Sequence, residues 1–239
     1  MARGKTLGAL LDGLRAACRI SLNAAHNVQH REAQIKALQL KQEWFWGDFA
    51  WPHLRVDRFL DAQAGLRYYD MPDDLDIDRI SHVEVRFGGA FVPVRWGIDA
   101  VHYASFDSDL DQRSDPIQRC KIVEDEQLEV WPIAATDFNA DTLEGRMKVV
   151  GIRKLNPLVN EEADKADLDD QLLILSCAAD YLAATGAKDA QLKLDQANRL
   201  YSKLRGRLMP RRKFTIGVGS RANDTRPQRI PIAVYNKTS

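Results

Sequence analysis

The sequence predicts an α+β protein: a helical bundle built from N- and C-terminal helices, an inserted antiparallel β-sandwich-like domain, and an extended C-terminal arm. Three observations predict this class. Apolar residues repeat at helical spacing near both ends of the chain, alternate with a period of two in the middle, and form no long period in the last 34 residues, which contain three prolines. With 239 residues, 45% of them hydrophobic, the chain is long enough to form a packed core.

We therefore divide the chain into four segments. Residues 1–53 are expected to form the N-terminal helices, 54–157 the β-rich domain, 158–205 the C-terminal helices, and 206–239 the extended arm. Because the helices of each end are short and amphipathic, we expect the N-terminal pair to pack against the C-terminal pair.

The N-terminal helices are predicted from apolar stripes. The first stripe consists of Leu7, Leu10, Leu11, Leu14 and Cys18. Asn23 is the expected cap of a second helix, which Pro52 ends. The aromatic residues at 44–46, 49 and 51 lie near the end of this helix. We expect them to fill the core where the helix meets a sheet. The alternative is an exposed aromatic patch for a partner.

The C-terminal helices are predicted from caps and stops. Asp167 is the expected cap of a helix from Leu168 to about Thr185, which Gly186 ends. A second helix is expected from about Asp189 to Arg205, with Gly206 as its stop.

Alternating residues predict strands in the middle of the chain, at 55–60, 66–69, 80–87, 92–96, 119–123, 127–131 and 146–153. Gly88-Gly89 separates two of these runs and predicts a hairpin, because both glycines tolerate a positive φ. A further pair of strands surrounds Glu124-Asp125-Glu126, and a turn is expected near Ala64-Gly65. Successive strands without long helices between them favour antiparallel pairing.

The charges of the chain are unevenly distributed. The 34 basic and 34 acidic residues cancel, but residues 206–239 carry eight basic residues and one acidic residue, a net charge of +7. The rest of the chain therefore carries −7. An acidic body with a basic arm indicates a partner for the arm.

The candidate catalytic and metal motifs are incomplete, and we expect no catalytic residue, metal or cofactor. His26 and His30 have the spacing of zinc ligands, but the glutamate of that motif is missing. The run Asp107, Asp109, Asp111 and Asp115 resembles a calcium loop without its glycine and its last ligand. Gly217-Val218-Gly219-Ser220 precedes no helix and lacks the Lys-Ser/Thr of a phosphate loop. We interpret Cys120 as a core cysteine of a strand.

The compartment is predicted from two features. The three separated cysteines fit a reducing cytosol, and we expect neither a secretory signal nor a membrane span, since the longest apolar stretch is too short.

Several segments resemble the head-to-tail adaptor proteins of short-tailed bacteriophages. They cover most of residues 1–205 in the order found in that family, and they are 6–11 (TLGALL), 42–49 (QEWFWGDF), 51–56 (WPHLRV), 65–75 (GLRYYDMPDDL), 83–89 (VEVRFGG), 127–132 (QLEVWP), 153–158 (RKLNPL) and the helix at 169–184. The resemblance implies a structural protein of the virion neck, present in the host cytoplasm during assembly. It implies a ring, usually of twelve copies, that docks beneath the portal protein, continues the DNA channel without specific recognition of DNA, and carries the tail (nozzle or tube) protein.

In such adaptors the C-terminal segment commonly leaves the body and binds the portal protein or a neighbouring subunit. Here that function is expected of the arm, through Leu208, Arg211, Arg212, Phe214, Ile216, Arg229, Ile230, Ile232, Val234 and Tyr235. The alternation of Ile230, Ile232 and Val234 is typical of a strand that could add to the edge of a sheet.

Two other functions remain open. The basic arm, with Phe214 and Tyr235 available for stacking, could instead bind nucleic acid. The abundant carboxylates leave open a virion-associated cell-wall hydrolase, although no pair of them stands out.

Overall fold

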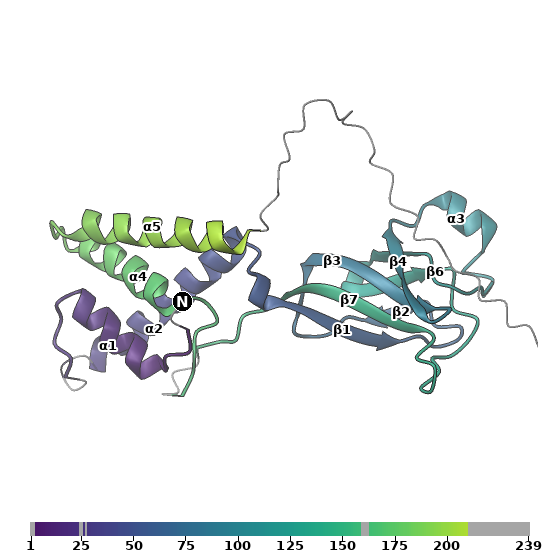
Figure 1. The fold of residues 1–239 in the computed structure, drawn as a ribbon, viewed down its shortest axis with the longest axis horizontal. Helices are drawn as coiled ribbons and strands as arrows, with labels where there is room; N and C mark the ends of the chain where they lie inside the picture. Colours follow the sequence, from purple (N-terminus) through teal and green to yellow (C-terminus); the bar gives the residue numbers. More distant parts are fainter. Residues whose placement is uncertain (1–2, 24–25, 27, 159–162, 210–239) are drawn as a thin grey trace, which may run out of the picture. The chain divides into compact units, whose positions relative to one another are not determined.

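The computed structural model describes residues 3–23, 26, 28–158 and 163–209 (Figure 1). The chain divides into two units, residues 1–208 and residues 209–239. The fold described here is that of the first unit. It combines helices and strands, and the predicted α+β class is confirmed.

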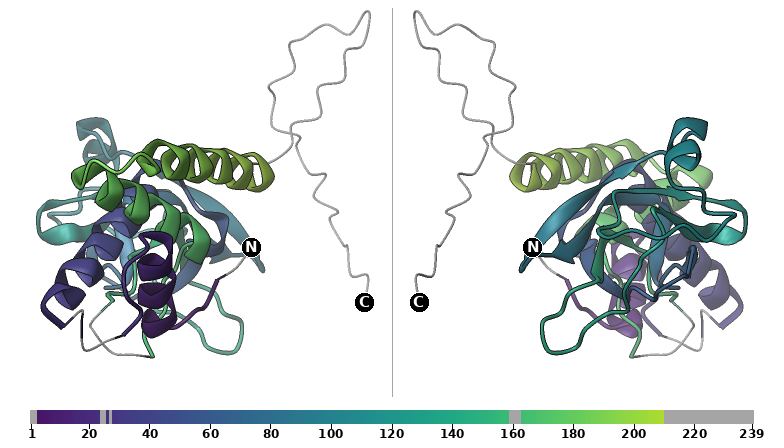
Figure 2. Two further views of the ribbon diagram at one scale, coloured as in Figure 1. Left: turned by 90° about the vertical axis from the view of Figure 1, so that its left-hand side faces the viewer. Right: turned by 90° about the vertical axis from the view of Figure 1, so that its right-hand side faces the viewer.

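Four long helices come from the two ends of the unit. They are α1 (Leu7–Ala17), α2 (Val28–Asp48), α4 (Asp170–Ala184) and α5 (Ala190–Leu208). Helices α1, α2 and α5 each pack against α4, and the left view of Figure 2 looks onto them. A Cβ at Gly13 of α1 would lie 2.7 Å from Ile174 Cδ1 of α4, so glycine allows these two helices to approach closely. The expected contact between the two ends of the chain is therefore present.

The ends of three helices differ from the prediction. Helix α2 begins at Val28, well after Asn23, and ends at Asp48. The cap of α4 is Asp169, whose Oδ1 accepts a hydrogen bond from the Leu172 N–H at 3.2 Å. Asp167 is not the cap because Arg153 and the Asn156 N–H, at 2.7 Å, bind its carboxylate. Helix α5 continues through Gly206 to Leu208.

The strands are β1 (Arg55–Asp61), β2 (Tyr68–Asp70), β3 (Leu75–Phe87), β4 (Ala90–Trp96), β5 (Arg119–Ile122), β6 (Gln127–Trp131) and β7 (Arg146–Arg153). In the described residues they form one curled sheet of seven strands, in the order β1-β7-β3-β4-β5-β6-β2 (Figure 1). Short 3₁₀ turns at Pro52–Leu54 and Glu124–Glu126 precede β1 and β6, and a short helix, α3 (Ala100–Ser105), follows β4.

The sheet departs from the predicted sandwich in three ways. The strands form one half-barrel in place of two stacked sheets. Strands β4 and β5 pair in parallel, although antiparallel pairing was expected throughout. Strands β1 and β2, which were expected to flank a turn, pair with β7 and β6 and not with each other. Local alternation gives the positions of strands, but their partners depend on how the sheet curls.

Both predicted hairpins are confirmed. Strands β3 and β4 meet at Gly88 and Gly89, which have φ values of +63° and +79°. The Glu144 carboxylate accepts hydrogen bonds from both glycine N–H groups, at 3.0 and 2.7 Å, and so fixes the turn. Strands β5 and β6 pair around Glu124–Glu126.

Each half of the unit has its own apolar core. The helical core contains the four leucines of α1 and five residues of α4 (Leu172, Leu173, Ile174, Cys177 and Ala178), together with Trp51 and Leu54. The sheet core lies inside the curl and includes Tyr69, Cys120, Leu128 and Met147. Cys120 is fully buried in β5, as predicted, and burial raises the pKa of its thiol to about 12.

Candidate functional site

The residues predicted to bind a partner lie almost entirely outside the described residues. These are Arg211, Arg212, Phe214, Ile216, Arg229, Ile230, Ile232, Val234 and Tyr235, and the Gly217–Ser220 segment lies there too. Leu208 is described. It is the last residue of α5 and packs, half-buried, against the helical core, so it belongs to the folded body and not to the arm.

A groove lies between the two edge strands of the sheet. Strands β1 and β2 follow each other in the chain but sit at opposite ends of the strand order. Because the sheet curls, Leu60 and Asp61 of β1 and Tyr68 and Tyr69 of β2 line one pocket of about 590 Å³. We call this pocket the seam groove; Gln63, Leu66, Asp70 and Gln127 complete its wall.

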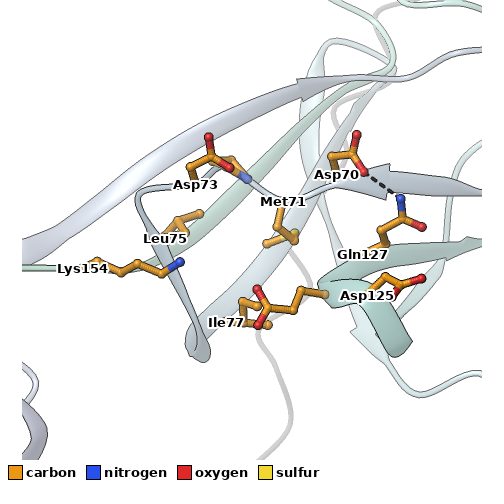
Figure 3. Close-up of a pocket in the computed structure, with 10 residues that line it drawn as sticks. Asp70, Met71, Asp73, Leu75, Ile77, Asp125, Gln127 and Lys154 are labelled. Carbon is orange, nitrogen blue, oxygen red and sulfur yellow. Dashed lines mark hydrogen bonds between the residues drawn. The ribbon is translucent and has the colours of Figure 1, made fainter.

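An acidic pocket of about 300 Å³ adjoins the seam groove and shares Asp70 and Gln127 with it. Gln127 Nε2 donates a hydrogen bond to Asp70 Oδ1 at 2.7 Å (Figure 3). Figure 3 shows Lys154, Asp73 and Leu75 on one side of this pocket, Asp70, Gln127 and Asp125 on the other, and Met71 and Ile77 between them. Glu126 is the fourth carboxylate of the lining. The two pockets together present apolar side chains beside an excess of negative charge.

Hydrogen bonds hold the walls of the seam groove in place. The Tyr69 hydroxyl accepts from the Gln63 N–H at 3.0 Å and donates to the Gln63 carbonyl at 3.3 Å, and burial raises the pKa of Tyr69. Arg58 of β1 binds Asp74, which follows β2, with Nε 3.0 Å from both carboxylate oxygens. These hydrogen bonds lower the pKa of Asp74. The Arg58–Asp74 pair therefore links β1 to the residue before β3, and Tyr69 links β2 to the loop after β1.

A buried carboxylate, Glu129 of β6, anchors the neighbouring part of the sheet. Glu129 is 1% exposed, and its Oε1 accepts from Arg67 Nε at 2.8 Å and from the Tyr103 hydroxyl at 2.7 Å. Its Oε2 lies 3.1 Å from Lys121 Nζ. Burial alone would raise the pKa of Glu129, but the hydrogen bonds from Tyr103, Lys121 and Arg67 outweigh it and lower the pKa. This network links α3, β5, β6 and the residue before β2.

The aromatic residues at the end of α2 differ in burial. Phe45 and Trp51 are buried, and Trp46 donates from Nε1 to the Arg153 carbonyl of β7 at 3.2 Å. The expected packing of this segment between helix and sheet is therefore confirmed for these residues. Trp44 is 59% exposed, with Lys41 above its ring.

The motifs that resembled metal sites make structural contacts. Asp109 pairs with Arg67, and Asp111 pairs with Arg113. Asp115 accepts from the Ala135 N–H at 3.1 Å and from the Thr136 hydroxyl. Over the described ranges, no group of three or more His, Cys, Asp or Glu side chains is arranged to hold a metal ion.

Comparison with known proteins gives no family. No family model matches the chain, and no curated protein matches it either. Within the part of the chain that the structure describes, no helix has the length and apolar character needed to cross a membrane.

The seam groove is not predictable from the sequence. The sequence contains the apolar residues and the carboxylates of the groove, but the curl of the sheet is what brings them to one place. The only signal in the sequence was the density of acidic residues at 70–78 and 124–126.

Proposed function

We propose that this protein is a subunit of a head-to-tail adaptor of a short-tailed bacteriophage. In this function, copies of the chain, twelve in the family that it resembles, form a ring in the virion neck under the portal protein. The ring extends the DNA channel and carries the tail (nozzle or tube) protein, and the chain catalyses no reaction. The observation that carries the proposal is the separation of charge between an acidic body and a basic C-terminal arm, on a chain whose segments resemble adaptors in order.

The layout of the unit supports this proposal. Helices α1, α2 and α5 pack against α4, and all the described strands lie between α2 and α4 in the sequence. A helical bundle with an inserted β-domain is the layout that the resemblance implies, and this order of elements supports it. A closed ring needs two different complementary surfaces on each copy, and a body with a separate arm of opposite charge can provide them.

The acidic body suits the wall of a DNA channel. Residues 1–205 carry a net charge of −7, so phosphate groups of passing DNA would be repelled from the body on average and would not bind to it. The basic arm is then available for a protein partner in the virion.

The mass of the native protein tests the proposal. The full chain is measured alone and mixed with the portal protein from the same virion, by native mass spectrometry or light scattering. We expect a complex that contains several copies of the chain per portal ring. A chain that stays a single copy in both samples, at concentrations where the portal ring is intact, would contradict the proposal.

The second candidate function, binding of nucleic acid, rests on the same arm. Its seven basic residues in 210–239, with one acidic residue, could contact phosphates. A salt titration with duplex DNA separates the two functions. Tight binding that falls steeply as salt rises favours nucleic acid, whereas little binding near physiological salt leaves the arm to a protein partner.

A further inference from the structure

We infer that the seam groove binds a strand from a second copy of this chain, and that residues 228–235 of the neighbour's arm are this strand. The inference deepens the proposed function, on which it rests for the contact between copies, and it names the partner of this part of the arm.

The first argument is the free edge of β1. All seven residues of β1 pair with β7 on one side, and no strand among the described residues lies on the other side. An edge strand presents a row of backbone N–H and C=O groups that can pair with an extended peptide. The edge of β2, which is three residues long, borders the same groove. The half-barrel is thus open between two edges where one added strand would narrow the gap.

The second argument is the apolar character of the groove beside this edge. Leu60, Leu66 and Tyr68 line it. The arm contains Ile230, Ile232 and Val234 in alternation, which as a strand would present three β-branched side chains to one face. Pro231 removes one N–H donor, which an added edge strand tolerates on the side that faces away from β1.

The third argument is charge. The side chain of Asp61 is about half exposed at the groove, where it pairs with Arg146, and the adjoining pocket adds the exposed residues Asp73, Asp125 and Glu126. Lys154 is the one basic residue of that lining. Residues 210–239 carry seven basic residues against one acidic residue. The groove and the arm are therefore complementary in both polarity and charge.

The length of the arm allows the contact between copies. Twenty-one residues, 209–229, separate the end of α5 from Ile230, and they span roughly 70 Å when extended. Each copy would offer one groove and one strand. This arrangement joins different surfaces of successive copies, as a closed ring requires.

Cross-linking between two full-length variants tests the inference. One copy carries Leu60→Cys, at a residue that lines the groove, and the other carries Ile232→Cys, while the native thiols Cys18, Cys120 and Cys177 are all buried. The mixture is oxidised both alone and with the portal protein. We expect a disulfide-linked pair of copies at a yield about tenfold above that of a control mixture. In the control, Val101→Cys, which is 78% exposed on α3, replaces Leu60→Cys.

A second variant tests the pairing of the backbone. Adding Ile232→Pro to a copy that carries Val234→Cys should reduce the cross-link to Leu60→Cys about tenfold, because the new proline removes a donor that faces β1. Thr238→Pro, outside the strand, is the matched control and should leave the yield unchanged. Equal losses in both variants would show that the arm does not pair with β1 as a strand.

The outcomes separate this inference from the proposed function. If the two variants give no more cross-link than the Val101→Cys control, or if a chain with both cysteines links only within itself, the inference is wrong. A ring on the portal protein without the cross-link would leave the proposed function standing. A cross-link between copies that never bind the portal protein would support binding of the arm in the seam groove and contradict the adaptor function.

Discussion

Replacement of Glu129 by glutamine tests whether the buried network fixes the sheet beside the seam groove. Glutamine has nearly the same shape, so the substitution removes the negative charge while it leaves the volume of the core unchanged. Arg67 Nε and the Tyr103 hydroxyl, 2.8 and 2.7 Å from Oε1, and Lys121 Nζ, 3.1 Å from Oε2, would then surround a neutral amide. The glutamine amide keeps one oxygen that accepts hydrogen bonds, but its N–H group faces Arg67 or Lys121, which also donate.

The size of the effect follows from these contacts. Removing one partner of a buried ion pair costs about 3–5 kcal/mol when the other charge stays buried. Here the cost is lower, because the Arg67 and Lys121 side chains are 21% and 36% exposed and Arg67 keeps Asp109 at 2.6 Å. We expect Glu129→Gln to lower the free energy of unfolding by about 2–4 kcal/mol at pH 7, which corresponds to roughly 5–15 °C in Tm.

The stability of the fold depends on the ionisation of Glu129. The folded protein lowers the pKa of Glu129 from its usual 4.5, so the ionised form stabilises the fold. This stabilisation is present above the unfolded pKa and is lost as the pH falls through the folded pKa. The difference between the native chain and Glu129→Gln should therefore be constant from pH 7 to pH 5 and should narrow in more acidic buffer.

Urea unfolding followed by tryptophan fluorescence, at pH 7, 5 and 3, measures this difference. Glu124→Gln, at an exposed position of the β5–β6 connection, is the matched control and should change the stability by less than about 0.5 kcal/mol. A loss below about 1 kcal/mol for Glu129→Gln at pH 7, or a loss that stays the same at pH 3, would refute this reasoning.

Three further predictions concern the two cores. Burial raises the pKa of Cys120 and Cys177 to about 12, so at pH 8 both thiols should react with a disulfide reagent at least about 100-fold more slowly in the native protein than in denaturant; rapid native labelling would contradict this. Gly151→Ala should cost about 1–3 kcal/mol in urea unfolding, because its Cβ would lie 3.0 Å from Leu75 Cδ2 and 3.3 Å from the Arg79 carbonyl. The control Gly206→Ala, in α5 with open space around it, should instead stabilise by about 0.5–1 kcal/mol. Burial raises the pKa of Asp170, so Asp170→Asn should raise stability at pH 7, with the gain absent below the usual carboxyl pKa; a loss at pH 7 would contradict this.

The pattern of apolar residues predicts elements well where each element is regular. The stripe from Leu7 to Leu14 is a helix with a buried face, and β7 has the predicted bounds, Arg146–Arg153. Gly88-Gly89 specifies its hairpin because the turn requires a positive φ at both residues. These features depend on neighbours along the chain.

Boundaries and caps are predicted less well, because residues distant in the sequence compete for the same groups. Asp167 has the side chain of a helix cap, but Arg153 and Asn156 bind it, and Asp169 takes its place. Gly206 has the freedom to stop a helix, but α5 continues for two residues beyond it to Leu208, which packs against the helical core. Local preference of about 1 kcal/mol is easily outweighed by such contacts.

The sequence by itself determined the order of the elements, the hairpin turns and the opposite charges of body and arm, because each of these depends on residue types at fixed spacing along the chain. Only the tertiary structure decided that β1 and β2 are separate edges, that β4 and β5 run in parallel, and that one groove lies beside both edges. Strand partners are chosen by the curl of the whole sheet around its core, and this curl is a property of all seven strands together.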